Sequence, residues 1–121
     1  MTTALIIEDC QDIRETLAEM LELAGYHVLS ARNGVTGMEI ARSKRPDIVL
    51  CDIMMPEIDG YTVLHLLRQD PELASVRFIF MTAKSESSEM AMGAELGADG
   101  YLVKPFDDLA LFAVIEGRLG R

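Results

Sequence analysis

Acidic residues follow two apolar runs of the chain, in positions that suit cation binding. Glu8 and Asp9 come directly after the run 4–7, and Asp52 comes directly after the run 47–51. Carboxylates that lie close together repel one another and need a compensating positive charge. Mg²⁺ prefers oxygen ligands and commonly binds through one or two carboxylates, several waters and phosphate oxygens. The three carboxylates therefore predict a magnesium site, provided that the fold brings them together.

Two further polar residues also stand at the ends of apolar runs. Thr82 follows the run 76–81, and Lys104 follows the run 100–103. The Lys104 ammonium can pair with an anion, and the Thr82 hydroxyl can donate to a phosphoryl oxygen. A carboxylate beside a metal ion and a lysine can act as a nucleophile towards phosphorus and form an aspartyl phosphate. Each residue alone fits a helix cap or a solvated loop, but their joint occurrence after four runs favours a functional site.

The pattern of apolar residues predicts the elements that must position this site. Short runs rich in β-branched residues predict buried strands at 4–7, 26–30, 47–51, 76–81 and 100–103. Helical spacing predicts helices at 13–24, 35–43, 61–68, 86–96 and 107–119, and Gly25 supplies a stop for the first of them. Strict alternation predicts an α/β fold with a doubly wound, five-stranded parallel sheet and helices on both faces. In such sheets the working site lies beyond the carboxyl ends of the strands.

Composition narrows the class of protein. The 121 residues fit a single domain over 1–121, and the formal net charge is −9. This acidity argues against direct binding of nucleic acid or of an anionic membrane surface, because both need a basic footprint. No apolar run approaches the length of a spanning helix. The two cysteines, Cys10 and Cys51, lack metal-ligand spacing, so we expect reduced thiols in a cytoplasmic protein.

The chain resembles the receiver domain of two-component response regulators over essentially its whole length. The resemblance is carried by four segments in order and spacing: Glu8-Asp9, the stretch from Asp52 through Met55-Pro56 to Asp59-Gly60, Thr82-Ala83, and 97–106 with the sequence GADGYLVKPF. It implies a flavodoxin-like sheet with the strand order 2-1-3-4-5. It also implies a regulatory signalling domain, rather than an enzyme acting on a separate substrate.

The resemblance assigns roles to the acidic residues. Asp52 would be the phospho-acceptor, and it would receive the group from a sensor histidine kinase or a histidine phosphotransfer protein. Asp9 and Asp52 would bind Mg²⁺ directly, Glu8 would bind it through water, and Met54 would bind it through its backbone carbonyl.

The resemblance also implies how a signal leaves the site. Thr82 and Tyr101 would form a switch pair, in which the hydroxyl moves towards the phosphoryl group and the aromatic ring follows it inward. Lys104 would pair with the phosphoryl group, and a cis Pro105 would direct that lysine. The face made by helix 86–96, strand 100–103 and helix 107–119 would then change shape for a partner.

Other proteins of related chemistry fit less well. A haloacid-dehalogenase phosphatase needs a second Asp two positions after its nucleophile, where this chain has Met54. A flavodoxin needs a hydroxyl- or glycine-rich phosphate loop after the first strand, where this chain has Glu8-Asp9, and a Gly-rich nucleotide loop is missing. A protein-interaction module of the same fold that is never phosphorylated stays open, as does the choice between a stand-alone regulator and part of a longer protein.

The predicted helix 107–119 is apolar on two sides. Its stripe towards the sheet consists of Leu111, Phe112, Ile115 and Leu119, and its opposite side carries Leu109, Ala110, Ala113, Val114 and Gly117. An apolar second face is typical of a contact surface. It predicts contact with a second copy of the domain or with an output segment. The alternative is that small residues are simply tolerated there.

Overall fold

Five parallel strands form one sheet in the computed structural model, which describes residues 1–83 and 97–119 without the side chains of 118 and 119. The strands are β1 (Thr3–Ile7), β2 (His27–Ala31), β3 (Ile48–Asp52), β4 (Arg77–Thr82) and β5 (Gly100–Val103). Their order is β2-β1-β3-β4-β5, and every neighbouring pair is parallel. The predicted flavodoxin-like order 2-1-3-4-5 is confirmed. The predicted helix 86–96 lies outside the described residues.

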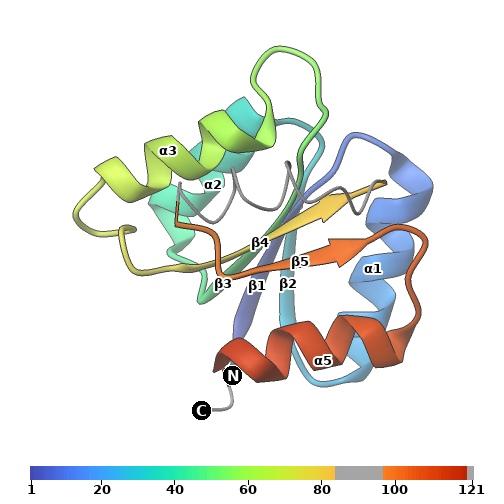
Figure 1. The fold of residues 1–121 in the computed structure, drawn as a ribbon. Coiled ribbons are helices and arrows are strands. Elements are labelled where there is room, and N and C mark those ends of the chain that lie inside the picture. The colour runs from blue at the N-terminus through green and yellow to red at the C-terminus, as the bar shows by residue number, and fades with distance from the viewer. Residues whose placement is uncertain (84–96, 120–121) are drawn as a thin grey trace.

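Helices cover both faces of this sheet (Figure 1). They are α1 (Gln11–Leu23), α2 (Gly34–Lys44), α3 (Gly60–Gln69) and α5 (Asp108–Leu119). α1 and α5 lie on one face, and α2 and α3 lie on the other. Asn33 and Asp59 cap α2 and α3, since each side chain accepts from a backbone N–H three residues further on. Gly25, with φ +95°, ends α1 as predicted.

Alternate residues of each strand enter two separate cores. In β1, Leu5 and Ile7 pack towards α2 and α3, whereas Ala4 and Ile6 pack towards α1 and α5. A strand covered on both faces is apolar at successive positions, and this explains why the strands read as continuous apolar runs. No helix of the described residues has both the length and the apolarity needed to cross a membrane.

The strand that leads to Asp52 ends one residue later than the run of apolar residues predicts. β3 includes Asp52, whose backbone is in register with Met81 of β4, so ladder pairing fixes Asp52 at the sheet edge. α3 then begins at Gly60, directly beside β3. A Cβ atom at Gly60 would lie 2.5 Å from the Asp52 carbonyl oxygen, so only glycine lets the helix approach this closely.

The two sides of α5 differ from the prediction at one position. Leu111 and Ile115 are fully buried, while Leu109 is 80% exposed and Ala113 is exposed, as the helical wheel predicts. Val114 is half-buried against the core, so its placement on the outer side was wrong. It stands three residues after Leu111, and on a helix this spacing keeps two residues on one face. The side chain of the predicted Leu119 lies outside the described residues.

Candidate functional site

Glu8, Asp9 and Asp52 come together because β1 and β3 are neighbours in the sheet. Ile7 pairs with Cys51, so the residues that follow these positions meet at one edge. One carboxylate oxygen from each of the three residues lies within 4.8 Å of the others. Glu8 and Asp52 are buried, at 1% and 8% exposure, whereas Asp9 is exposed. Two carboxylates are thus largely withdrawn from water, and the third stands at the protein surface.

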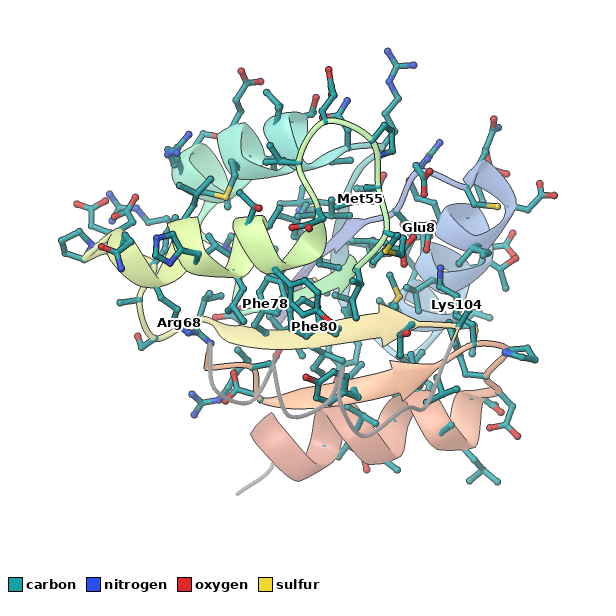
Figure 2. All side chains as sticks on the ribbon, turned by 45° about the horizontal axis from the view of Figure 1, so that its top comes forward. Glu8, Met55, Arg68, Phe78, Phe80 and Lys104 are labelled. Atoms are coloured by element: carbon teal, nitrogen blue, oxygen red, sulfur yellow. The ribbon has the colours of Figure 1, made fainter. Side chains whose placement is uncertain are left out.

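Lys104 brings a positive charge to this cluster from the residue after β5. Its Nζ lies 2.7 Å from Glu8 Oε1 and 3.3 Å from Asp52 Oδ1. The Lys104 backbone N–H donates to the Thr82 carbonyl at 2.7 Å, which fixes the start of the segment after β5 against the end of β4. Figure 2 shows Lys104 and Glu8 at the same end of the sheet. One ammonium therefore serves two carboxylates, and Glu8 is the nearer.

Burial disfavours the ionised forms of Glu8 and Asp52. It raises the pKa of Glu8 despite the hydrogen bond from Lys104. It also raises the pKa of Asp52, against the opposing charge of Lys104 and with a further raising effect from Asp9. Burial on its own lowers the pKa of Lys104, but the hydrogen bond to Glu8 and the charge of Asp52 outweigh it and raise that pKa. The cluster thus holds more negative charge than one lysine compensates.

The carboxylate of Glu8 is fixed on both oxygens. Oε1 accepts from Lys104, and Oε2 accepts from the backbone N–H of Cys10 at 3.1 Å. The backbone carbonyl of Glu8 accepts from the Arg14 guanidinium at 2.8 Å. Sequence reasoning missed Arg14. The only available signal was that Arg14 is the sole basic residue of α1, placed within a turn and a half of the acidic pair.

The remaining predicted residues differ in burial. Thr82, 5% exposed, ends β4 at the same edge of the sheet as Asp52. The Tyr101 ring is half-buried, with its centroid 5.6 Å from that of Phe80. The Lys104–Pro105 peptide is cis, as the resemblance implies. The side chain of Met54 is 78% exposed, and a ligand role for its carbonyl stays a prediction.

The donor set fits a hard divalent cation. All three clustered side chains offer carboxylate oxygens, the ligand type that Mg²⁺ prefers, and none offers a soft sulfur or an imidazole. A divalent charge would also offset the burial, and the smaller repulsion between carboxylates, that raise the Glu8 and Asp52 pKa values. These residues can therefore hold Mg²⁺ next to the Asp52 carboxylate.

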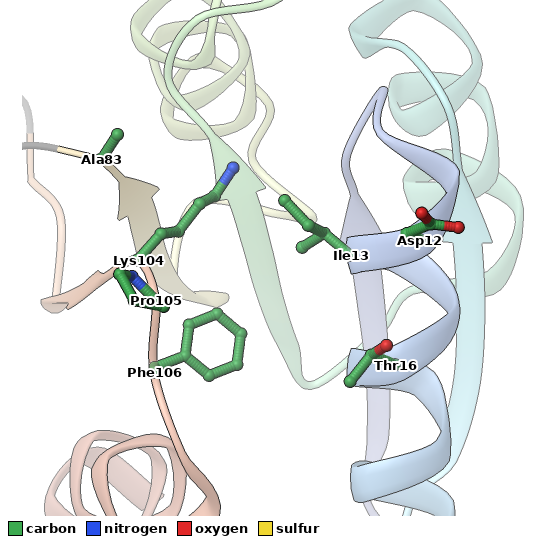
Figure 3. Close-up of a pocket in the computed structure, with 7 residues that line it drawn as sticks. All are labelled: Asp12, Ile13, Thr16, Ala83, Lys104, Pro105 and Phe106. Atoms are coloured by element: carbon green, nitrogen blue, oxygen red, sulfur yellow. The ribbon is translucent and has the colours of Figure 1, made fainter.

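A cavity opens beside Lys104, between α1 and the segment that follows β5 (Figure 3). Its volume is about 440 Å³, and its lining is mainly apolar: Asp12, Ile13, Thr16, Ala83, Lys104, Pro105 and Phe106. Lys104 both lines this cavity and contacts the carboxylates, so the cavity lies next to the cluster.

Comparison with known proteins identifies the family. Residues 4–116 match the family model of the response regulator receiver domain. The DNA-binding dual master transcriptional regulator RpaA of Synechocystis sp. is 36% identical over 121 residues, which are 100% of this chain and 50% of that protein. Protein PilH of Pseudomonas aeruginosa is 36% identical over 119 residues, 98% of each chain. This chain thus spans about half the length of RpaA and almost all of PilH.

Solved structures agree with this result. The chemotaxis protein CheY4 of Vibrio cholerae superposes with a TM-score of 0.95 at 27% identity, over 98% of this chain and 99% of that one. Fold, family model and full-length similarity therefore lead to one conclusion: the chain belongs to the response regulator receiver domain family.

Proposed function

We propose that this receiver domain accepts a phosphoryl group on Asp52 in a Mg²⁺-dependent reaction, and so serves as a signalling switch of a two-component system. The observation that carries the proposal is the position of Lys104 Nζ, 3.3 Å from Asp52 Oδ1, within a cluster whose three carboxylates lie within 4.8 Å of one another. This arrangement places one ammonium beside an Asp52 carboxylate oxygen, next to carboxylates that can hold the Mg²⁺ that a transferred phosphoryl group needs.

The donor is a phosphohistidine of a sensor histidine kinase or of a histidine phosphotransfer protein. An Asp52 carboxylate oxygen attacks the phosphorus, an O–P bond forms as the N–P bond breaks, and the electron pair returns to the leaving imidazole nitrogen. Glu8, Asp9 and Asp52 would hold Mg²⁺, together with the Met54 carbonyl. When bound, Mg²⁺ supplies charge neutralisation at the phosphoryl oxygens. Lys104 pairs with one of these oxygens, and the domain acts as a catalyst on no other substrate.

The new group alters the site through charge and hydrogen bonding. It adds about −1.5 to −2 charge and three acceptor oxygens. Thr82, buried beside Asp52, donates to one of these oxygens, and Tyr101 follows it inward along the Phe80 ring. The surface around β5 and α5 then differs between the two states, and a partner that prefers one of them reads the signal.

Partners follow from the surfaces next to this site. The cavity beside Lys104 is the approach for the phosphohistidine donor. The exposed side of α5, with Leu109 and Ala113, contacts a second copy of the domain or an output segment. The net charge of −9 disfavours direct contact of this domain with nucleic acid or with a membrane, and we propose a cytoplasmic location.

Acetyl phosphate, a small phosphodonor, tests the proposal directly. Intact-protein mass spectrometry should show one added phosphoryl group on the wild type with Mg²⁺, and none on Asp52→Asn or in EDTA. Equal incorporation in both proteins, or full incorporation in EDTA, would refute the assignment. No incorporation at all would favour the alternative, an interaction module of the same fold that works unphosphorylated.

A further inference from the structure

Arg68 connects three segments at the end of the sheet opposite the carboxylate cluster. Figure 2 shows it near the start of β4, with Lys104 beyond the other end of that strand. Arg68 belongs to the last turn of α3. Its Nη1 donates to the carbonyls of Val76 at 2.8 Å and Ala74 at 3.2 Å, in the loop before β4. Its Nη2 donates to the Gly97 carbonyl at 2.8 Å and to Asp99 Oδ2 at 3.3 Å, just before β5.

Asp99 extends this network into the strands. Its Oδ2 also accepts from the Phe78 backbone N–H at 2.8 Å, and its own N–H donates to the Phe78 carbonyl at 2.7 Å. β5 enters the sheet one residue later, with Gly100 paired to Ile79 and Tyr101 paired to Phe80. Asp99 therefore ties the residue before β5 to Phe78 of β4, and Arg68 donates to the same Asp99 oxygen.

The local chain accommodates the guanidinium closely. The Arg68 and Asp99 side chains are only 20% and 26% exposed, so water screens their contact far less than that of a surface ion pair. Gly97 has φ +100°, a conformation that residues with a side chain rarely adopt. A Cβ atom there would lie 3.2 Å from Arg68 Nε. Hydrogen bonds with a charged donor are also stronger than neutral ones.

The contacts of Arg68 and Asp99 continue through two phenylalanine rings to Tyr101, the aromatic residue of the proposed switch pair. Phe78, which Asp99 binds through its backbone, stacks edge-on against Phe80 at 5.0 Å between ring centroids. Phe80 in turn contacts the Tyr101 ring at 5.6 Å. β5 has four residues and stands at the edge of the described sheet, where β4 is its one neighbour. A short edge strand can shift easily unless something outside the ladder holds it.

We propose that Arg68 is a positioning residue for Tyr101: it holds the amino end of β5 to β4 and α3, so that Tyr101 keeps its place against Phe80 and responds to changes at Thr82. The response to Thr82 rests on the proposed switch function, whereas the placement of Tyr101 does not. Without Arg68, β5 is free to shift, and a movement of Thr82 then displaces β5 instead of moving the Tyr101 ring.

The test compares Arg68→Met with the wild type by NMR and mass spectrometry. In the unphosphorylated protein, the Phe78 amide should exchange about tenfold faster or more, because the Asp99 carboxylate that it binds loses its cation. The Tyr101 ring resonances should also move. With acetyl phosphate and Mg²⁺, uptake at Asp52 should match the wild type, while the phosphorylation-dependent change at Tyr101 is lost. Arg68→Lys, which keeps the charge, should restore part of that change.

Arg45→Met is the matched control, because it removes an arginine–carboxylate contact with Glu72 that is 62% exposed on both sides. It should leave Tyr101 and its response as in the wild type. A merely structural role for Arg68 would lower the melting temperature but leave the Tyr101 response of the folded protein intact, and that result would overturn the proposal. If Arg68→Met does not fold, Asp99→Asn weakens the same contact and is judged by the same two readouts.

The two proposals can fail separately. A wild-type protein that takes up no phosphoryl group would refute the switch function. The amide exchange of Phe78 and the Tyr101 ring shift in unphosphorylated Arg68→Met would still decide whether Arg68 positions Tyr101. If the Phe78 amide exchange rate and the Tyr101 ring resonances are both as in the wild type, Arg68 does not position Tyr101.

Discussion

Removing the charge of Asp52 should stabilise the protein when no metal is present. The carboxylate oxygens lie within 4.8 Å of one another, and at that upper limit two like unit charges repel by about 3.5 kcal/mol at an effective dielectric constant near 20. Asp52 meets two such neighbours, Glu8 and Asp9, and is attracted by Lys104 Nζ at 3.3 Å with about 5 kcal/mol on the same scale. Water and salt screen the repulsion from the exposed Asp9, so the net repulsion on Asp52 is about 1 kcal/mol. Burial of the Asp52 carboxylate acts in the same direction.

Thermal unfolding in EDTA at neutral pH measures this effect. Asp52→Asn should raise the Tm by about 4 °C, since about 1 kcal/mol corresponds to that shift in a domain of this size. Mg²⁺ at a hundredfold excess over its dissociation constant should stabilise the wild type by about 2.7 kcal/mol, if it binds only the folded state. The variant should gain much less, because one of the three carboxylates is gone.

A matched variant separates the cluster from net charge alone. Glu39→Gln removes one negative charge from an exposed position on α2 and should leave the Tm almost unchanged. If Asp52→Asn instead lowers the stability of the metal-free protein, Asp52 is not under net repulsion and the reasoning fails. An equal gain from Mg²⁺ in both proteins would remove Asp52 from the metal site.

Three further predictions concern pH, the switch and the outer side of α5. The folded-state pKa of Asp52 is raised above its ordinary 3.8, so its contribution to stability is present below pH 3.8 and is lost as pH rises through the folded pKa. In thermal melts from pH 4 upwards in EDTA, the Tm difference between Asp52→Asn and the wild type should therefore grow with pH, and a constant difference would contradict this. Thr82→Ala should be phosphorylated like the wild type but show a smaller NMR change at Tyr101, and an unchanged response would exclude Thr82 from the switch. If α5 mediates self-association, Leu109→Glu with Ala113→Glu should give monomers in analytical ultracentrifugation, while a wild type that is monomeric in both phosphorylation states would rule out the dimer.

The sheet and the carboxylate cluster were predictable because both leave direct patterns in the sequence. Residues of β1 and β3 are buried on both faces, so each strand is a continuous apolar run. A parallel sheet aligns the carboxyl ends of its strands, which brings Glu8 and Asp52 to one edge wherever the strands are adjacent. Position at the end of an apolar run was therefore enough to find the carboxylates, Thr82 and Lys104.

Contacts between side chains and backbone carbonyls were not predictable in this way. Arg14 and Arg68 donate to carbonyl oxygens, which every residue carries, so no residue type marks their partners. The preference of Lys104 for Glu8 over Asp52 is a difference between 2.7 and 3.3 Å, which sequence spacing does not encode. The helical wheel places Val114 wrongly, because the buried stripe of α5 is wider than the four residues that it predicts.

Mapping the phosphorylated residue tests the central claim most directly. The wild-type protein is treated with acetyl phosphate in Mg²⁺ or in EDTA, the acyl phosphate is reduced with borohydride, and the peptides are sequenced by tandem mass spectrometry. The account predicts a single reduced residue, Asp52, in the Mg²⁺ sample and none in EDTA. Reduction at another carboxylate such as Asp9, or at Asp52 to the same extent in EDTA, would contradict it.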